Sequence, residues 1–394
     1  MQNNKVVITG IGLLSSLGEG IEAHWSALNS GGRPNVDSER FAPYTVHPAP
    51  EIDWNLQIPK RSDQRQMETW QRLGTYTAGL ALQDAGVKDD EALCATMDMI
   101  VAAGGGERDV EVDTQILTEG RTANERGVML NAKLSTDLRP TLFLAQLSNL
   151  GAGNISIVHK VTGSSRTFMG EEGSGISAIE TAVARIRSGQ STHILVGASY
   201  NSEHPDMLLG YELGGLLKTD GWAPLWQREG SEGGGIVTGT GGVFLVLENA
   251  DHATARSARA YAAIDAVEGD QLRRQRGGLQ AAIQETLAKL AGDNPAPLIV
   301  SGASGAHEAT AAEKSALDAI PNAAVRGFSG LTGHLREAQF PLAVALAALS
   351  IWKGETYKPF DPASEHASDQ PVTEAIATTI GCIRAEGMAR LVKA

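Results

Sequence analysis

Two adjacent carboxylates, Glu171 and Glu172, stand where an apolar segment turns at Gly170 into a helical pattern. Helix N-termini present free backbone N–H groups and a positive partial charge, and many α/β enzymes place a nucleophile at such a corner. A carboxylate at this position is more often an anion that the helix end stabilises than a covalent catalyst. We therefore expect Glu172 to be an anion held by helix N–H groups.

The segment from Ser165 to Gly189 must position these carboxylates. Apolar residues at spacings of three and four predict one buried helix face, made of Ile176, Ile179, Val183 and Ile186. Small residues fill the first turns and would let another backbone approach closely; they are Gly173, Ser174, Gly175, Ser177 and Ala178. The helix is predicted to end at residues 188–189, and a buried strand to begin at His193.

The composition of the whole chain limits its class and partners. Of 394 residues, 42% are hydrophobic and 20% are charged, as expected for a globular protein with a large core. The formal net charge of −13 argues against nucleic acid and anionic membranes as partners. Cys94 and Cys382 are far apart in the sequence and predict neither a metal site nor a disulfide framework.

Targeting and membrane signals are not expected from the sequence. The apolar run at residues 340–352 is too short to cross a bilayer and predicts a core helix. The N-terminal residues lack the layout of a signal peptide. We therefore expect a cytoplasmic protein with no membrane segment.

The run VVITGIGLLSSLGEGIEAHWSALNSGGRP at residues 6–34 is a buried-strand pattern that closes in a glycine turn. Its Gly-x-Gly lacks the third glycine of a dinucleotide-binding loop. It closely resembles the opening of the β-ketoacyl-acyl-carrier-protein synthases, condensing enzymes of the thiolase superfamily. In that family VVVTGxGxxSPLG is followed by a tryptophan, an Ala-Leu pair and a glycine-rich turn.

The helix at Glu172 resembles the active-site helix of the same family. The family pattern is T-A-C-x-S-G, with a glycine seventeen residues after the cysteine; counting back from Gly189 places Glu172 at the cysteine. The condensing reaction needs a nucleophile that forms a thioester by exchange and later releases the acyl group to a carbanion. A carboxylate would have to form a mixed anhydride, so the resemblance implies that Glu172 cannot replace the cysteine.

Three further landmarks of the family are altered. The first histidine of the family, in AHGTxTxxGD, aligns with Gly302. In the motif K-S-x-x-GH, Ser329 stands at the lysine, whereas the Gly-His pair survives at His334. The glycine-rich gating loop GFGGTN becomes GCIRAEG at residues 381–387. We expect a structural role for His334, since a lone histidine at a helix start is more often structural than catalytic.

The resemblance also assigns a role to the helix expected at residues 107–117. In the condensing enzymes the equivalent segment lies at the dimer interface and lines the acyl pocket of the partner. By that resemblance Val110, with Glu111 and Thr114 nearby, is a candidate for setting the depth of the pocket. Interface packing alone is the alternative, and the sequence leaves both open.

Basic residues gather near the start of the helix predicted over residues 67–85: Lys60, Arg61, Arg65 and Arg72. A solvated helix face is the more common explanation of such a group. The resemblance implies another role, the docking of an acidic acyl carrier protein.

The fold class that the resemblance implies is α/β. We expect the five-layer αβαβα thiolase-like fold, built as two similar halves, residues 1–250 and 251–394, in one compact unit. The strand-then-glycine pattern at residues 298–305 echoes the opening of the chain, as two similar halves would require.

Altered catalytic positions on an intact framework imply a non-catalytic copy. The chain looks like a chain-length factor, which forms a heterodimer with a catalytic ketosynthase homologue, meets the acyl carrier protein through that complex and shapes the acyl tunnel. The pathway would be type II polyketide or specialised fatty-acid synthesis, with aryl polyene assembly the nearest likeness. No cofactor and no metal ion are expected. The alternatives are an active 3-oxoacyl-carrier-protein synthase or malonyl-carrier decarboxylase that uses Glu172 and His334, and a self-paired scaffold.

Overall fold

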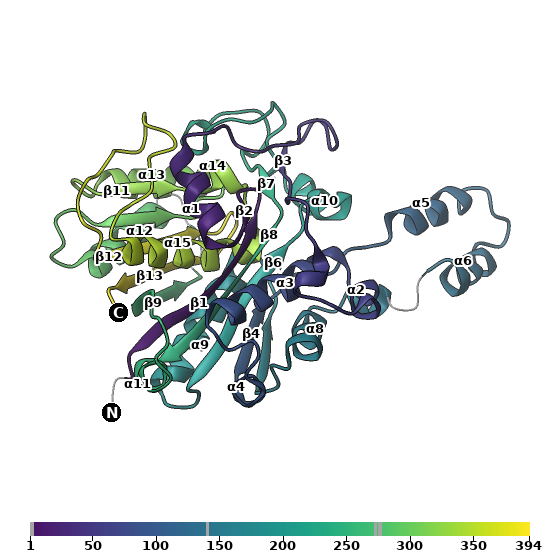
Figure 1. Cartoon of the computed structure of the whole chain (residues 1–394). Helices are drawn as coiled ribbons and strands as arrows, with labels where there is room; N and C mark the ends of the chain where they lie inside the picture. The colour runs from purple at the N-terminus through teal and green to yellow at the C-terminus, as the bar shows by residue number, and fades with distance from the viewer. Residues whose placement is uncertain (1–3, 139–141, 272–273, 275–277) are drawn as a thin grey trace.

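The computed structural model describes residues 4–138, 142–271, 274 and 278–394. Two sets of strands form most of its main sheet (Figure 1). The first set is β1 (Val6–Ser15), β4 (Asp98–Ala102), β5 (Ser165–Phe168), β6 (His193–Tyr200) and β8 (Gly241–Asn249). The second set is β9 (Ala262–Asp270), β10 (Leu298–Ser301), β11 (Ala324–Gly327), β12 (Glu374–Ile380) and β13 (Glu386–Val392).

The two sets have the same topology. The strand order across the sheet is β11-β10-β12-β13-β9-β1-β8-β6-β4-β5, so the second set mirrors the first about the β9–β1 pair. In each set the strand next to the outer edge has a parallel neighbour on both sides, β5 and β6 around β4, and β11 and β12 around β10. The remaining pairs are antiparallel, including the β1–β9 junction of residues 6–8 with 262–264.

Helices complete five layers. In the middle, α9 (Glu172–Arg187) and α15 (Gln339–Lys353) pack on each other and on strands of both sets. On the outside, α3 (Thr69–Asp84) and α8 (Asn149–His159) cover the first set, and α12 (Gly278–Ala291) and α13 (His307–Asp318) cover the second. This arrangement confirms the predicted αβαβα class and its two similar halves. The boundary near residue 250 stays a prediction.

The remaining elements connect or extend these layers. The helices are α1 (Gly20–Ser30), α2 (Arg61–Gln66), α4 (Glu91–Thr96), α5 (Val110–Glu119), α6 (Arg126–Thr136), α7 (Leu142–Ala145), α10 (Pro205–Leu213), α11 (Ala250–Ala255) and α14 (Ser329–Thr332). The short strands are β2 (Gly18–Glu19), β3 (Val46–His47) and β7 (Thr238–Gly239), and the 3-10 turns are η1 (Trp54–Leu56), η2 (Leu225–Gln227) and η3 (Arg336–Ala338).

The central helices explain how the site is positioned. The α9 face predicted from its three-and-four spacing is buried in the main core, as is nearly all of α15. A methyl group at Gly175 would lie 2.2 Å from the carbonyl oxygen of Glu337 and 3.1 Å from Cδ of Pro341. The small residues of α9 therefore permit the close backbone approach that the sequence predicted, and they bring Glu172 next to the segment before α15.

No helix in the described part of the chain is long and apolar enough to cross a membrane.

Gly175→Ala should disturb this close approach. Because the new methyl group has no space beside the Glu337 carbonyl, we expect a loss of about 1–3 kcal/mol in the free energy of unfolding, measured in urea. Gly210→Ala is the matched control, since Gly210 is an exposed helical glycine with open space around it. There we expect no loss, and up to about 1 kcal/mol of gain from helix propensity. Equal effects of the two substitutions would contradict the proposed close contact.

Candidate functional site

Glu172 begins α9 and is almost fully buried, with 1% of its surface exposed. Its Oε1 atom lies 2.9 Å from Nε2 of His334 and accepts a hydrogen bond of 3.2 Å from the backbone N–H of Cys382. The ring nitrogens of His334 make no aligned hydrogen bond, so the contact of the two side chains is chiefly electrostatic. The sequence predicted an anion at this corner, but its main partners come from other segments and not from the first turn of α9.

The ionisation of Glu172 reflects these contacts. Burial favours the neutral carboxyl, but interactions with His334 and with the N–H groups of Glu172 and Cys382 outweigh it and lower the pKa of Glu172. The same carboxylate raises the pKa of the Cys382 thiol, whose own burial acts in that direction too. The corner therefore holds a buried carboxylate and a thiol that stays protonated.

The backbone of His334 is fixed independently of its ring. Its N–H donates to the carbonyl of Val237 over 2.8 Å, and its carbonyl accepts from Gly239 over 3.0 Å, next to β7. The Tyr211 ring lies nearly perpendicular to the imidazole, at an interplanar angle of 83° and with the ring centres 6.1 Å apart. His334 is thus a buried residue whose backbone is fixed by neighbouring segments and whose ring contacts Glu172. The structural role expected from the sequence stays a prediction.

An arginine and a second buried carboxylate form the next layer. Arg336 adopts a φ of 49°, a left-handed conformation that costs energy for this residue. Its guanidinium carbon lies 5.8 Å from the ring centre of Tyr200 and 5.9 Å from that of Tyr211. Nε of Arg336 lies 3.4 Å from the Glu337 carboxylate, which is 1% exposed. The site is therefore lined by charged and phenolic groups.

The other aligned positions meet at one glutamine. The amide nitrogen of Gln339 donates to the hydroxyl of Ser329 over 2.6 Å and to the carbonyl of Gly302 over 3.0 Å. Its oxygen accepts from the N–H of Leu335 over 2.8 Å. A Cβ at Gly302 would come within 2.5 Å of the Thr379 hydroxyl, so this backbone leaves no space for a histidine side chain.

The loop at 381–385 is tied to the glutamate corner. Besides the N–H of Cys382, Arg384 lies 3.8 Å from Glu171. Arg274 donates to the Cys382 carbonyl over 3.0 Å and pairs with Glu386 at 3.0 Å. These charged contacts fix the position of the loop. From the sequence alone, only the loss of its glycines had been noted.

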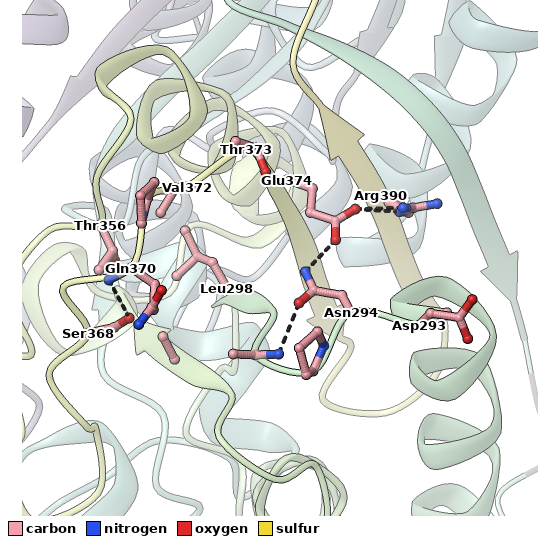
Figure 2. Close-up of a pocket in the computed structure, with 15 residues that line it drawn as sticks. Asp293, Asn294, Leu298, Thr356, Ser368, Gln370, Val372, Thr373, Glu374 and Arg390 are labelled. Carbon is pink, nitrogen blue, oxygen red and sulfur yellow. Dashed lines mark hydrogen bonds and ion pairs between the residues drawn. The ribbon is translucent and has the colours of Figure 1, made fainter.

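Within the described part of the chain, the cavity beside the Glu172 site is small. A small cavity near Glu337, lined also by Gly104, Tyr200 and Arg336, measures about 10 Å³, near the minimum for one water molecule. A larger cavity, about 650 Å³, lies at the amino ends of β10 and β12 and is lined by none of the site residues above (Figure 2). Its polar groups satisfy one another, as Figure 2 shows for Asn294, Glu374 and Arg390. Ligands of α/β sheets favour the carboxyl ends of strands, so we assign this cavity no function.

The predicted tunnel residues lie on an arm outside the five layers. Figure 1 shows α5 and α6 extending away from the body of the molecule. Val110, Glu111 and Thr114 are all exposed on α5 and line none of the cavities described above. Exposed apolar side chains continue along the arm, with Leu117 71% and Val128 64% exposed.

The predicted basic group is divided between two helices. Lys60 precedes α2, and Arg61 and Arg65 lie on it with exposed side chains. Arg72 lies on α3, where its guanidinium is 5.5 Å from the ring centre of Trp54. No His, Cys, Asp or Glu cluster suited to a metal ion occurs within the described ranges.

Residues that sequence analysis missed are Arg336, Glu337, Gln339 and Tyr211. The signal for three of them was present, because the sequence LREAQF at residues 335–340 places two charges and an amide directly before an apolar run. Tyr211 gave no signal, since its contact with His334 depends on the tertiary fold.

The pH dependence of stability should report on Glu337. Burial raises the pKa of Glu337 to about 7, although the Arg336 charge opposes this. A carboxyl with a raised pKa binds its proton more tightly in the folded state, so its stabilising contribution is lost as pH rises from 4.5 through 7. We expect Glu337→Gln to gain stability over wild type between pH 5 and pH 8, by up to about 3 kcal/mol. Thermal unfolding measures this, with exposed Glu229→Gln as control; parallel curves for wild type and Glu337→Gln would contradict it.

Curated relatives are synthases of acyl chains. Over 275 residues the chain is 26% identical to 3-oxoacyl-[acyl-carrier-protein] synthase 2 of Vibrio cholerae, an alignment that covers 67% of this chain and 62% of the relative. The chain thus matches less than two thirds of that relative's length. The Staphylococcus aureus (strain COL) protein of the same name is 24% identical over 379 residues, covering 89% of this chain and 86% of the relative.

Solved structures share the fold. The structure titled "The ishigamide ketosynthase/chain length factor" superposes with a TM-score of 0.79 at 18% identity, covering 100% of both chains. A "type II PKS acyl-carrier protein in complex with its ketosynthase bound to the hexaketide" gives a TM-score of 0.77 at 18% identity, also over 100% of both chains. The family model "Beta-ketoacyl synthase, N-terminal domain" matches residues 3–253. The chain therefore belongs to the β-ketoacyl synthase family of the thiolase superfamily.

Proposed function

We propose that this chain is the non-elongating subunit of a two-component ketosynthase, similar to a chain-length factor. The observation that carries the proposal is the buried Glu172 carboxylate, which stands at the position of the family cysteine and pairs with His334. A carboxylate cannot exchange with a thioester as a thiolate does. The missing side chain at Gly302 removes a second catalytic group.

Surface features support a partner subunit. β5 is the edge strand of the first set, and its backbone groups on one side are available for pairing with another chain. The α5–α6 arm presents apolar side chains to solvent, a pattern that marks interaction sites. We assign this edge and arm to a catalytic ketosynthase homologue. The first of the solved structures above carries both a ketosynthase and a chain-length factor in its title.

Carrier protein and pathway belong to the same proposal. The exposed Lys60, Arg61 and Arg65 would complement an acidic carrier protein, as charge steering favours. One solved relative is described as an acyl-carrier protein complex of a type II polyketide ketosynthase. We propose type II polyketide or specialised fatty-acid synthesis in the cytoplasm, with aryl polyene assembly the nearest case.

An enzymatic function is the second candidate, and the 2.9 Å contact of Glu172 with His334 favours it. A buried carboxylate beside an imidazole can transfer protons, which malonyl decarboxylation or condensation would require. A homodimer without a tunnel role is the remaining alternative. Purification of the natural complex distinguishes it, because our proposal expects a cysteine-bearing homologue in equal amount.

The purified chain alone should neither bind acyl groups covalently nor form carbon–carbon bonds. Intact-mass spectrometry after incubation with acyl and malonyl carrier proteins measures loading, and product analysis measures elongation. Glu172→Cys is the informative variant. It restores a thiol but not the imidazole at Gly302, so we expect at most acyl loading without elongation. Acylation at Glu172 of the wild type, or release of carbon dioxide from malonyl carrier protein that Glu172→Ala abolishes, would favour the enzymatic function.

Val110 should influence product length in the complex. Val110→Phe would shorten and Val110→Ala would lengthen the product if this side chain closes the tunnel of the partner, as measured by mass spectrometry of released chains. Thr118→Val, an exposed position on the same helix, is the control and should leave the distribution unchanged. An unchanged distribution for all three variants would remove Val110 from the tunnel.

A further inference from the structure

Arg228 is completely buried and lacks a counter-charge. Its side chain is 0% exposed, and its Nε donates to the carbonyl of Ala223 over 2.9 Å. Nη1 and Nη2 have no hydrogen-bond partner, and no carboxylate in the described part of the chain forms an ion pair with it. Burial alone lowers the pKa of this guanidinium to about 9.

Other buried arginines of the same chain satisfy the usual rule. Arg326 is 1% exposed, and its Nε and Nη1 donate to the carbonyls of Tyr357 and His366 over 2.6 and 2.9 Å. Arg256 pairs with the buried carboxylate of Glu248. Buried polar groups are almost always paired, and an unpaired buried charge is strongly destabilising. Arg228 is therefore an exception that needs a partner.

The surroundings of Arg228 offer donors and positive potential. A Cβ at Gly305, which has a φ of 94°, would lie 3.0 Å from Nη1 and 2.6 Å from the carbonyl oxygen of Gly235, so Nη1 lies close to the backbone of Gly305. Gly305 directly precedes the N-cap of α13, Ala306, which makes no side-chain capping bond. The first N–H groups of a helix have no partner within it, and this end carries positive partial charge.

Neighbouring side chains do not supply the missing negative charge. His47 is 0% exposed, and its burial together with the nearby Arg228 charge lowers the pKa of its imidazole to about 3, so it is neutral. Ser231 and His307 face each other at 3.4 Å and also carry no negative charge. A water molecule could accept hydrogen bonds from Nη1 and Nη2, but only an anion would also balance the charge.

We propose that Arg228 and the start of α13 hold a small inorganic anion of the chloride type. The guanidinium supplies two free donors, and the helix end supplies free N–H groups and favourable potential. The fully buried setting favours a monatomic ion over a bulky one. This assignment does not depend on the proposed function.

The anion would stabilise the segment that holds His334. Arg228 lies on the connection from η2 to β7, and the residues at the end of this connection bond to the His334 backbone. A structural ion at Arg228 would thus fix the loop beneath the site without taking part in any reaction.

Thermal unfolding of the full chain in different salts tests the proposal. Potassium chloride, potassium phosphate and potassium gluconate are compared at equal ionic strength, so that general screening is constant. We expect 200 mM chloride to raise the unfolding temperature by at least about 2 °C over gluconate, because a ligand that binds only the folded state stabilises it. Arg228→Met should lose this dependence, whereas Arg326→Met, another buried arginine, should keep it.

Each outcome of these measurements either supports or overturns the anion site at Arg228. A phosphate-specific gain that Arg228→Met abolishes would overturn the chloride assignment and identify an oxyanion as the occupant. Equal unfolding temperatures of the wild type in all salts, or an unchanged chloride gain in Arg228→Met, would overturn it. Should Arg228→Met fail to fold, crystals of the wild type soaked in bromide provide the readout. An anomalous peak within hydrogen-bonding distance of Nη1 or Nη2 is expected, and its absence would refute the site.

Discussion

The Glu172 carboxylate must stay ionised inside the protein, and much of the surrounding structure meets that requirement. Burial opposes its charge, so the imidazole of His334, the N–H of Cys382 and the positive end of α9 must together compensate. Two of these partners come from segments distant in the sequence, and the third is the end of the helix that Glu172 itself begins. Loss of any one would leave an incompletely compensated buried charge, and the segments are therefore fixed relative to one another.

Charge also determines what the space beside Glu172 can contain. Arg336 and Glu337 lie next to this space. Arg336 has an unfavourable φ, and Glu337 is a buried acid. A growing acyl chain needs an apolar channel of considerable volume, whereas the cavity here is about 10 Å³. The charges of Arg336 and Glu337 make this space unsuitable for an apolar chain, and the carboxylate at the cysteine position is unsuitable for thioester exchange. Both features agree with the proposal that this subunit does not elongate an acyl chain.

Local patterns in the sequence were sufficient for the framework. The three-and-four spacing of α9 and the apolar run of α15 follow from helix geometry, and the repeated strand order follows from the family resemblance. The site was only partly predictable. Glu172 and His334 were identified as altered positions, but 162 residues separate them in sequence, and their contact depends on the packing of α9 against the segment before α15. The role of Gln339, which joins Ser329 to Gly302, likewise needed three-dimensional proximity.

The architecture joins the Glu172 corner to the exposed edge strand of the first set. α9 follows β5 directly in the sequence, so the altered corner and the exposed edge strand belong to one strand–turn–helix unit. The α9 helix of that unit packs on α15 between the two sets of strands. Under the proposed function, pairing through β5 and the neighbouring arm would depend on this five-layer core. A buried carboxylate that is fully compensated fits such a core, because it satisfies the corner without requiring the space or the reactivity of a thiolate.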